Sequence, residues 1–239
     1  MNAHIVAKFD GELEELLAHT LSMGQLVRAQ LALAGAALQA FDDGRAEEVV
    51  RKDSEVNGWE VRIDREIESI FARRQPAAGD LRLMLGVSRV SVDLERMGDE
   101  ARNIARTIGY FDPADPARKT MAAALAPAFS TADLMIREAL RSLKDRDAVV
   151  ARQVIGLDRG IDDVFHALIA GLIETHGVKR EALRSEIIAA WIAKSIERVG
   201  DHVKNIAETV IYICEGADIH HEFYTEPGPG SVRPDSVEG

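Results

Sequence analysis

Apolar residues recur at intervals of three and four along nearly the whole chain between Gly11 and Gly216, in segments rich in Ala, Leu, Glu and Arg. This is the period of an amphipathic α-helix, in which positions three and four apart share one face. No segment of the sequence shows the alternation that is typical of a half-buried strand. The pattern therefore predicts an all-α protein.

Helix-breaking residues divide this pattern into six long helices. Asp10 is expected to cap the first helix, and Gly44 in "DDGR" is suited to the left-handed position that follows its end. Pro76 separates a second helix, residues 46–74, from a third that ends near residue 111. Asp115 and Pro116 then provide the cap and first residue of the next helix. The last three helices are expected at residues 117–144, 147–175 and 179–215.

The third and sixth helices carry an internal repeat. When the chain is shifted by 102 positions, "ERMGDEARNIARTIGY" aligns with "ERVGDHVKNIAETVIY", and nine of these sixteen positions are identical. Such self-similarity indicates duplication of a structural unit. We therefore expect two tandem, pseudo-symmetric three-helix bundles, residues 1–112 and 113–216, each about 45 Å long. Residues 217–239, which are rich in Pro and Gly, are expected to form a disordered C-terminal tail.

Within the repeat, polar residues are spaced by four on one side of each helix. The predicted core stripe of the third helix consists of Leu94, Met97, Ala101, Ile104 and Ile108. Glu95, Asp99 and Asn103 fall opposite this stripe and are expected to face outward. The pattern returns at Glu197 and Asp201, although like charges four apart on a helix cost a few tenths of a kcal/mol. This repetition favours a function for the acids.

The second helix of each half supplies a further polar stripe. The first-half stripe contains Asp53, Asn57, Glu60 and Asp64, and the second-half stripe contains Asp158, Asp162 and His166. If the second and third helices lie side by side, these side chains form an oxygen-rich patch suited to hard or borderline divalent or trivalent cations. The alternative is a solvated face of ordinary surface acids.

Glycines within the repeat allow two interpretations. Gly98 and Gly200 each cost about 1 kcal/mol relative to alanine inside a helix. They could permit close helix packing, or they could bring a metal or a partner near the backbone.

Composition limits the classes of function. A net charge of −11 and few aromatic residues argue against nucleic acid or an anionic membrane as a direct partner. The single Cys214 cannot form an internal disulfide bond, and the chain start lacks the features of a signal peptide, so we expect a cytoplasmic protein. No apolar run approaches the roughly 20 residues that a membrane-spanning helix needs, so any membrane role would run through partners.

The repeated motifs "ERMGDEARNIA" and "ERVGDHVKNIA", with "ARRQPAAGDLRLML" and "YICEGADIHH", resemble those of the PhoU family of phosphate-signalling proteins. The resemblance covers the chain to about His221. It implies two pseudo-symmetric three-helix bundles, with metals such as iron, zinc, manganese or magnesium on the acidic faces. Carried over by position, the implied metal ligands are Glu95, Asp99, Glu197 and Asp201 on the third helices, and Asp53, Asn57, Asp158 and Asp162 on the second helices.

The same resemblance implies a negative regulator of the phosphate-starvation response. It would link the ATPase of the high-affinity phosphate ABC transporter to a membrane sensor histidine kinase, and homodimers are common in the family. Because Asn57 replaces a carboxylate, weaker metal binding is expected in the first half.

Two alternatives stay open. The first is a carboxylate-bridged metal enzyme, but such bundles use Glu-x-x-His motifs, which this sequence lacks, and we expect no catalytic activity. The second is a metal-free helical scaffold whose acidic faces dock a basic partner.

Overall fold

The computed structural model describes the backbone of residues 2–76, 78–174 and 180–216, and the side chains of residues 8–76, 78–171 and 183–216. Every regular element in these ranges is a helix, which confirms the all-α prediction. The helices are α1 (Asn2–Ala40), α2 (Asp43–Arg74), α3 (Ala78–Ile108), α4 (Ala117–Asp145), α5 (Ala148–Leu157), α6 (Arg159–Glu174) and α7 (Arg180–Glu215). The tail predicted at residues 217–239 lies outside the described residues.

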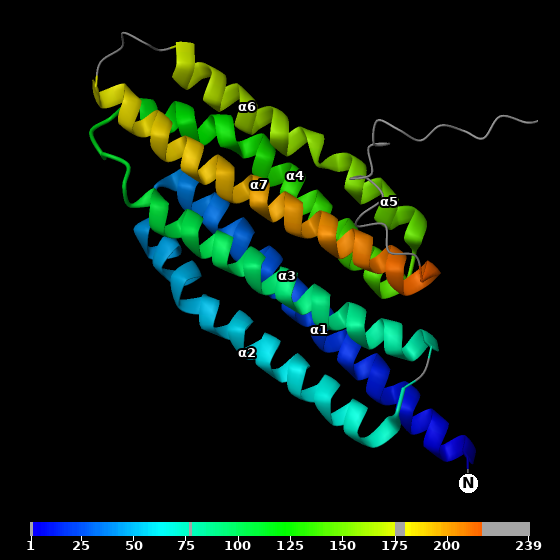
Figure 1. Ribbon diagram of the computed structural model, residues 1–239. Coiled ribbons are helices and arrows are strands. Elements are labelled where there is room, and N and C mark those ends of the chain that lie inside the picture. The colour runs from blue at the N-terminus through cyan, green and yellow to red at the C-terminus, as the bar shows by residue number, and fades with distance from the viewer. Residues whose placement is uncertain (1, 77, 175–179, 217–239) are drawn as a thin grey trace, which may run out of the picture.

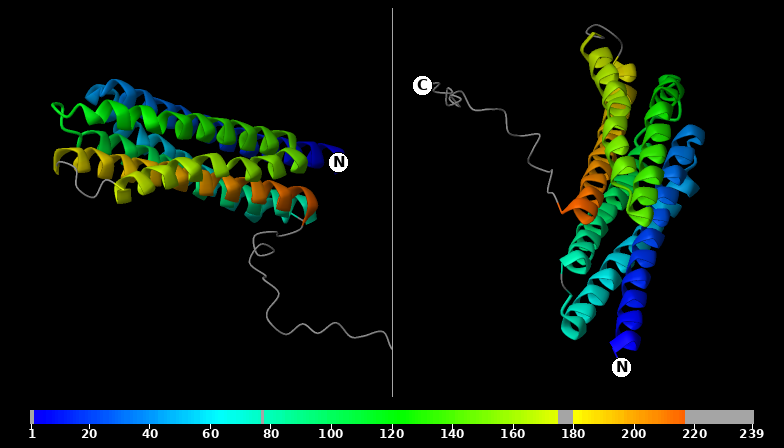
Figure 2. Two further views of the ribbon diagram at one scale, coloured as in Figure 1. Left: turned by 90° about the horizontal axis from the view of Figure 1, so that it is seen from above. Right: turned by 90° about the vertical axis from the view of Figure 1, so that its right-hand side faces the viewer.

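The helices form two elongated bundles that lie side by side (Figures 1 and 2). In the first bundle, α1, α2 and α3 all contact one another, and in the second, α4 and α7 pack with the consecutive pair α5 and α6. The bundles meet mainly where α3 runs antiparallel to α7, with a second contact between α1 and α4. Helices α2 and α6 therefore lie at opposite edges of the molecule (Figure 1).

Two predicted boundaries of the first helix are wrong. Helix α1 begins at Asn2, so Asp10 lies inside it and caps nothing. No strong helix breaker precedes Gly11, and the cost of one exposed glycine, about 1 kcal/mol, is smaller than the gain from burying Leu13 and its neighbours. Gly44 lies inside α2, and the left-handed position after α1 is Phe41, with φ of 53°.

The helix expected at residues 147–175 is interrupted once. Asp147 caps α5 by accepting hydrogen bonds from the backbone N–H groups of residues 149 and 150, and the helix is broken at Asp158 before α6 begins. Gly156 and Gly160 flank the break and lower the local helix propensity. Because Asp158 keeps right-handed helical angles, α6 continues α5 in nearly the same direction.

The predicted core stripe of α3 is confirmed. Leu94, Met97, Ala101 and Ile104 are fully inaccessible to solvent, and Ile108 is nearly so. Their spacing places them on the face of α3 that packs against other helices in both bundles. None of the helices in the described ranges combines the length and apolar character that crossing a membrane requires.

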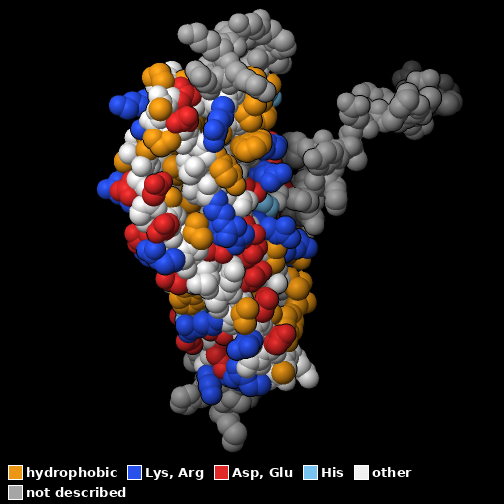
Figure 3. All heavy atoms as spheres, turned by 90° about the vertical axis from the view of Figure 1, so that its left-hand side faces the viewer, with side chains coloured by type: hydrophobic (Ala, Val, Ile, Leu, Met, Phe, Trp, Pro, Cys, Tyr) orange, Lys and Arg blue, Asp and Glu red, His pale blue; other side chains and the backbone are white. Residues whose placement is uncertain are grey.

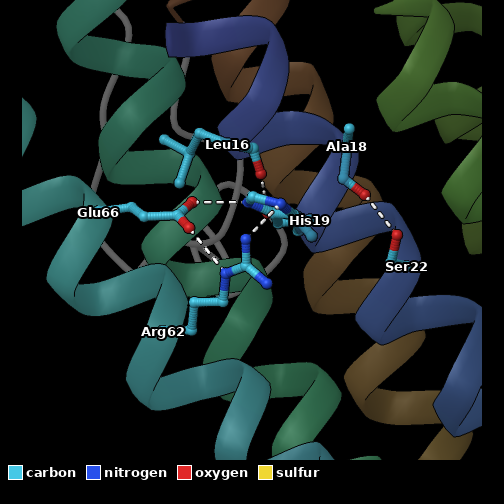
Figure 4. A network of polar contacts seen from close by, with 7 residues as sticks. Leu16, Ala18, His19, Ser22, Arg62 and Glu66 are labelled. Atoms are coloured by element: carbon cyan, nitrogen blue, oxygen red, sulfur yellow. Dashed lines mark hydrogen bonds and ion pairs between the residues drawn. The ribbon is translucent and has the colours of Figure 1, made fainter.

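Charged side chains join α1 to α2 outside the core. His19 on α1 lies 2.8 Å from the Oε2 atom of Glu66 on α2, and Arg62 bonds both of these residues (Figure 4). Nearer the start of α1, Glu12 accepts hydrogen bonds from Arg73 and Arg74 at the end of α2. These contacts fix the position of α2 along α1.

Candidate functional site

The first acidic groove lies between α2 and α3. Asp53 on α2 is only 7% exposed, and its Oδ2 atom accepts a hydrogen bond from Nη1 of Arg102 on α3. The second terminal nitrogen of Arg102, Nη2, lies 2.8 Å from Oδ1 of Asp99. One guanidinium group therefore bridges a carboxylate from each helix, while Oδ1 of Asp53 is buried without a hydrogen-bond partner. We call Asp53, Glu60, Glu95, Asp99 and Arg102 the first groove.

The second acidic groove is the pseudo-symmetric counterpart, between the α5–α6 break and α7. Asp158 is 6% exposed, and Nζ of Lys204 lies 3.0 Å from its Oδ2 atom. Lys204 stands 102 positions after Arg102, so both halves place a cation at the same point. Oδ1 of Asp158 is likewise buried without a hydrogen-bond partner. We call Asp158, Asp162, Glu197, Asp201 and Lys204 the second groove.

Negative charge exceeds positive charge in both grooves. Burial, together with the nearby Asp99 carboxylate, raises the pKa of Glu95, and burial and Glu95 raise the pKa of Glu60. In the second groove, burial and Asp158 raise the pKa of Asp162. Desolvation and Glu197 also raise the pKa of Asp201, which lies at the exposed rim. Each carboxyl is harder to ionise than usual, first because it is partly buried and second because the charges around it are already negative.

The two repeated glycines have different surroundings. A Cβ atom on Gly200 would lie 2.9 Å from Oδ1 of Asp158, so the missing side chain lets the buried carboxylate sit against α7. A Cβ atom on Gly98 would lie 3.2 Å from Cγ1 of Val56 on α2, closer than an ordinary van der Waals contact, so the missing side chain lets α2 and α3 pack closely. The site interpretation thus fits Gly200, and the packing interpretation fits Gly98.

The structure brings together most of the predicted site residues but corrects their orientation. Glu95 and Asp99 do not face outward: they are half-buried, because α2 packs beside α3 and covers that side of it. Asn57 is exposed, and the half-buried acid of that stripe is Glu60. No three acidic, histidine or cysteine side chains in the described parts of the chain lie together in an arrangement that could hold one ion.

Sequence reasoning missed the two cations. Arg102 and Lys204 follow Asp99 and Asp201 by three positions in both copies of the repeat, a spacing that favours an ion pair along a helix. This spacing could have predicted a cation beside each acid. The contact of each cation with the second helix of its bundle could not be predicted, because it depends on tertiary packing.

Polar residues also connect the two bundles between the grooves. Nη1 of Arg198 lies 3.2 Å from Oε1 of Glu100, and Nδ1 of His202 lies 2.9 Å from Oδ1 of Asp93. Asp93 also accepts a hydrogen bond from Asn205. His202 thus contributes to the bundle interface.

An apolar groove of about 510 Å³ lies at the end of the molecule where α3 finishes and α7 begins. Trp191 and Tyr110 are 57% and 53% exposed, and their ring centroids lie 6.5 Å apart in an edge-to-face arrangement. Leu183 and Ile187 complete its exposed apolar lining. Figure 3 faces this end of the molecule and shows hydrophobic side chains at the surface among charged ones.

The equivalent position in the other bundle is different. Arg89 stands 102 positions before Trp191, and its guanidinium group covers the ring of Tyr212 at 5.0 Å. The first bundle therefore has an arginine at the position where the second bundle has an exposed tryptophan. Exposed apolar patches of a few hundred Å² often mark interaction sites.

These features define a class of protein: a duplicated helical bundle with a buried aspartate, a facing acidic helix and a resident cation in each half. Comparison with known proteins gives the family. The model of the PhoU domain matches residues 20–108 and again residues 127–210, and the chain belongs to the PhoU family.

Relatives and solved structures agree with this assignment. A Burkholderia sp. protein named phosphate-specific transport system accessory protein PhoU homolog is 37% identical over 92% of this chain and 94% of its own length. The Escherichia coli K12 accessory protein PhoU is 31% identical over 92% of this chain and 91% of its own length.

The crystal structure of PhoU from Pseudomonas aeruginosa superimposes with a TM-score of 0.80 at 35% identity, over 87% of this chain and all of that one. The phosphate transport system regulatory protein PhoU from Streptococcus pneumoniae gives a TM-score of 0.81 at 27% identity, over 87% of this chain and 98% of that one.

Proposed function

We propose that this protein is a cytoplasmic, non-enzymatic negative regulator of the phosphate-starvation response that binds metal ions in its two acidic grooves. It would act as a homodimeric adaptor between the ATPase of the phosphate ABC transporter and the phosphate sensor histidine kinase. The similarity to phosphate transport accessory proteins over 92% of the chain carries the regulatory role.

The metal proposal is based on donor type and on the family resemblance, since no three acidic, histidine or cysteine side chains in the described residues are arranged to hold one ion. Carboxylate oxygens suit hard and borderline cations such as magnesium, manganese, iron and zinc. Oδ1 of Asp53 and Oδ1 of Asp158 are buried acceptors that no described group uses. Burial, and after it neighbouring carboxylates, raise the pKa of Glu95 and of Asp162. We assign Asp53, Asn57, Glu95 and Asp99 to a metal site in the first half and Asp158, Asp162, Glu197 and Asp201 to one in the second, with the exposed Asn57 as the weakest member.

Metal content tests this assignment. The full-length protein, purified without an affinity tag, is expected to contain iron, zinc, manganese or magnesium by elemental analysis. Asp99→Asn with Asp201→Asn should lower that content and leave the helical circular dichroism signal intact, because neither side chain belongs to the core. A wild-type protein free of metal, whose stability does not respond to chelator, would contradict the assignment.

The apolar groove supports the adaptor role. Tryptophan and tyrosine are common at the energetic centres of protein interfaces, and Trp191 and Tyr110 are both exposed here. We expect Trp191→Arg to weaken recovery of the transporter ATPase or the sensor kinase at least tenfold in a pull-down from cells grown with ample phosphate. The fold should tolerate this change, because Arg89 already occupies the equivalent position. Wild-type recovery of neither partner would contradict the adaptor role, and size-exclusion chromatography with light scattering tests the dimer.

One observation favours a metal-free scaffold as the second candidate. Arg102 and Lys204 already neutralise part of the carboxylate charge in the two grooves. In that case the grooves would stabilise the bundles without metal. The pull-down would then recover as much partner with chelator-treated protein as with untreated protein.

A further inference from the structure

We propose that the exposed seam between α3 and α7 is a docking surface for an amphipathic helix with acidic flanks, supplied by a partner protein. The seam is the line along which the two antiparallel helices meet at the surface, and it continues from the apolar groove at Tyr110 and Trp191. No described helix lies over it in Figure 1. This inference deepens the proposed adaptor function and rests on it.

Exposed apolar side chains gather on the seam. Elsewhere the described residues expose only two large hydrophobic side chains, Val61 on α2 and Val149 on α5. On α3, three exposed side chains lie within about 20° of one another around the helix, because they are spaced by 7 and 18 positions. Three more follow one another at every fourth position of α7. The six are Leu85, Val92 and Tyr110 on α3, and Leu183, Ile187 and Trp191 on α7.

The exposed charges of the seam are positive, although the whole chain carries a net charge of −11. Arg96 and Arg198 lie near the middle, and each exposes more than half of its side chain. Arg184 lines the apolar groove, is exposed and forms no ion pair with another described residue. Arg89 is exposed near the far end, with its guanidinium group over the ring of Tyr212. Arginines therefore accompany the apolar side chains along the length of the seam.

The nearest carboxylates do not cancel this charge along the seam. Asp93 and Glu100 face into the contact between the two helices, where side chains of α7 bond them. Asp99 and Asp201 belong to the two acidic grooves, on the α2 side of α3 and the α6 side of α7. The positive seam therefore runs between two negative grooves. A negatively charged partner would be attracted along the seam and repelled on either side of it.

The shape of the seam fits a helix. Tyr110 stands 25 positions after Leu85, so the seam is about 37 Å long at 1.5 Å per residue. A groove between two packed helices can receive a third, whose apolar residues at every third and fourth position lie in the groove. Arginines on both rims would then face the flanking positions of that helix. Acidic residues at those positions would pair with them.

Two other occupants fit this charge pattern less well. A second copy of the chain, docked on the same seam by two-fold symmetry, would place a basic surface against itself. An anionic bilayer would be repelled by the acidic grooves that border the seam and by the net charge of the chain.

Photocross-linking from the seam identifies its occupant. The photoreactive residue p-benzoylphenylalanine replaces Val92 on the seam or, as the matched control, the exposed Val61 on α2. The full chain is irradiated in cells grown with ample phosphate, and the captured peptide is sequenced by mass spectrometry. We expect at least fivefold more product from position 92 than from position 61. The captured peptide should have apolar residues at helical spacing and an excess of Asp and Glu.

Charge reversal tests the arginines. The captured segment is synthesised and titrated into the Trp59→Phe protein, in which Trp191 is the only tryptophan, and docking should shift its fluorescence to shorter wavelength. Arg184→Glu and Arg96→Glu should each weaken binding at least fivefold, and added salt should weaken binding to the unreversed protein. Arg65→Glu, at an exposed position of α2 away from the seam, should change the affinity less than twofold.

The docking surface and the adaptor role can fail separately. Capture of a segment without excess acid, of a second copy of this chain or of lipid would overturn the docking proposal, as would equal yields from positions 92 and 61. Equal effects of Arg184→Glu and Arg65→Glu would also overturn it.

The identity of the captured protein decides the adaptor role. An acidic amphipathic segment from a protein other than the transporter ATPase or the sensor kinase, released by Arg184→Glu, would support the docking surface and contradict the adaptor assignment. Capture of the ATPase or the kinase through a neutral or basic segment would do the reverse.

Discussion

At the scale of single residues, the main feature is a buried aspartate in each bundle. Asp53 and Asp158 would each be costly to bury alone, because an unpaired charge loses its hydration. Arg102 and Lys204 supply the compensating charge from the facing helix. The other groove acids outnumber these two cations, so part of their negative charge stays unbalanced. This excess charge makes the stability of the protein depend on pH.

Glu95→Gln is expected to stabilise the metal-free protein at neutral pH. The pKa of Glu95 is raised in the folded state, so its carboxyl contributes stability at low pH that is lost as pH rises above the usual value of 4.5 and through the folded-state pKa. In chelator at pH 7, the variant should gain about 0.5 kcal/mol in the free energy of unfolding. The gain should vanish below about pH 4, where the Glu95 carboxyl of the wild type is protonated and is as uncharged as the glutamine of the variant.

Urea titrations at both pH values measure this difference. Glu68 is exposed and belongs to neither groove, so Glu68→Gln provides the control. A Glu95→Gln variant that is no more stable than Glu68→Gln at pH 7 would show that the groove charges do not repel.

At the scale of elements, charged contacts supplement the packing of long helices. The sequence predicted the order of the helices and all but one of the breaks between them, because the apolar period, Pro76 and Pro113 are local signals. It misplaced the start of α1, since a cap residue such as Asp10 is only a preference that neighbouring packing overrides. It also missed the break at Asp158, which coincides with a contact to another helix.

Glu12→Gln should loosen the end of α2 from α1. Hydrogen bonding to Arg74, supported by Arg73, lowers the pKa of Glu12 to about 2. The pair therefore adds stability above pH 4.5 that is lost as pH falls toward 2. At pH 7 we expect a loss of about 1 kcal/mol in the free energy of unfolding, measured by urea denaturation. The loss should shrink with acidification, and the neighbouring exposed Glu14, changed to Gln, should show no such trend.

At the scale of the whole molecule, the contact between α3 and α7 holds the two bundles together. A Cβ atom at Gly86 on α3 would lie 2.5 Å from Cδ1 and 2.6 Å from Cγ1 of Ile213 on α7. The missing side chain therefore sets how closely the bundles approach. This closeness in turn lets Arg198 reach Glu100 and His202 reach Asp93.

Gly86→Ala is expected to destabilise the protein by about 1–2 kcal/mol through overpacking at this interface. Gly58→Ala is the matched control, because no atom lies within 4 Å of its added Cβ, and it should stabilise α2 by up to about 1 kcal/mol. Thermal unfolding followed by circular dichroism measures both changes. Equal effects of the two substitutions would mean that Ile213 repacks without cost.

The sequence by itself determined the helical class, the duplication of a helical unit, the core stripe of α3 and most of the acids in the two grooves. It could do so because helical periodicity and an internal repeat are local features of the chain. Only the tertiary structure decided that Glu95 and Asp99 are half-buried, that Asn57 is exposed, and that Arg102 and Lys204 stand among the carboxylates. These outcomes depend on how neighbouring helices are rotated and spaced, which is set by contacts between residues far apart in the sequence.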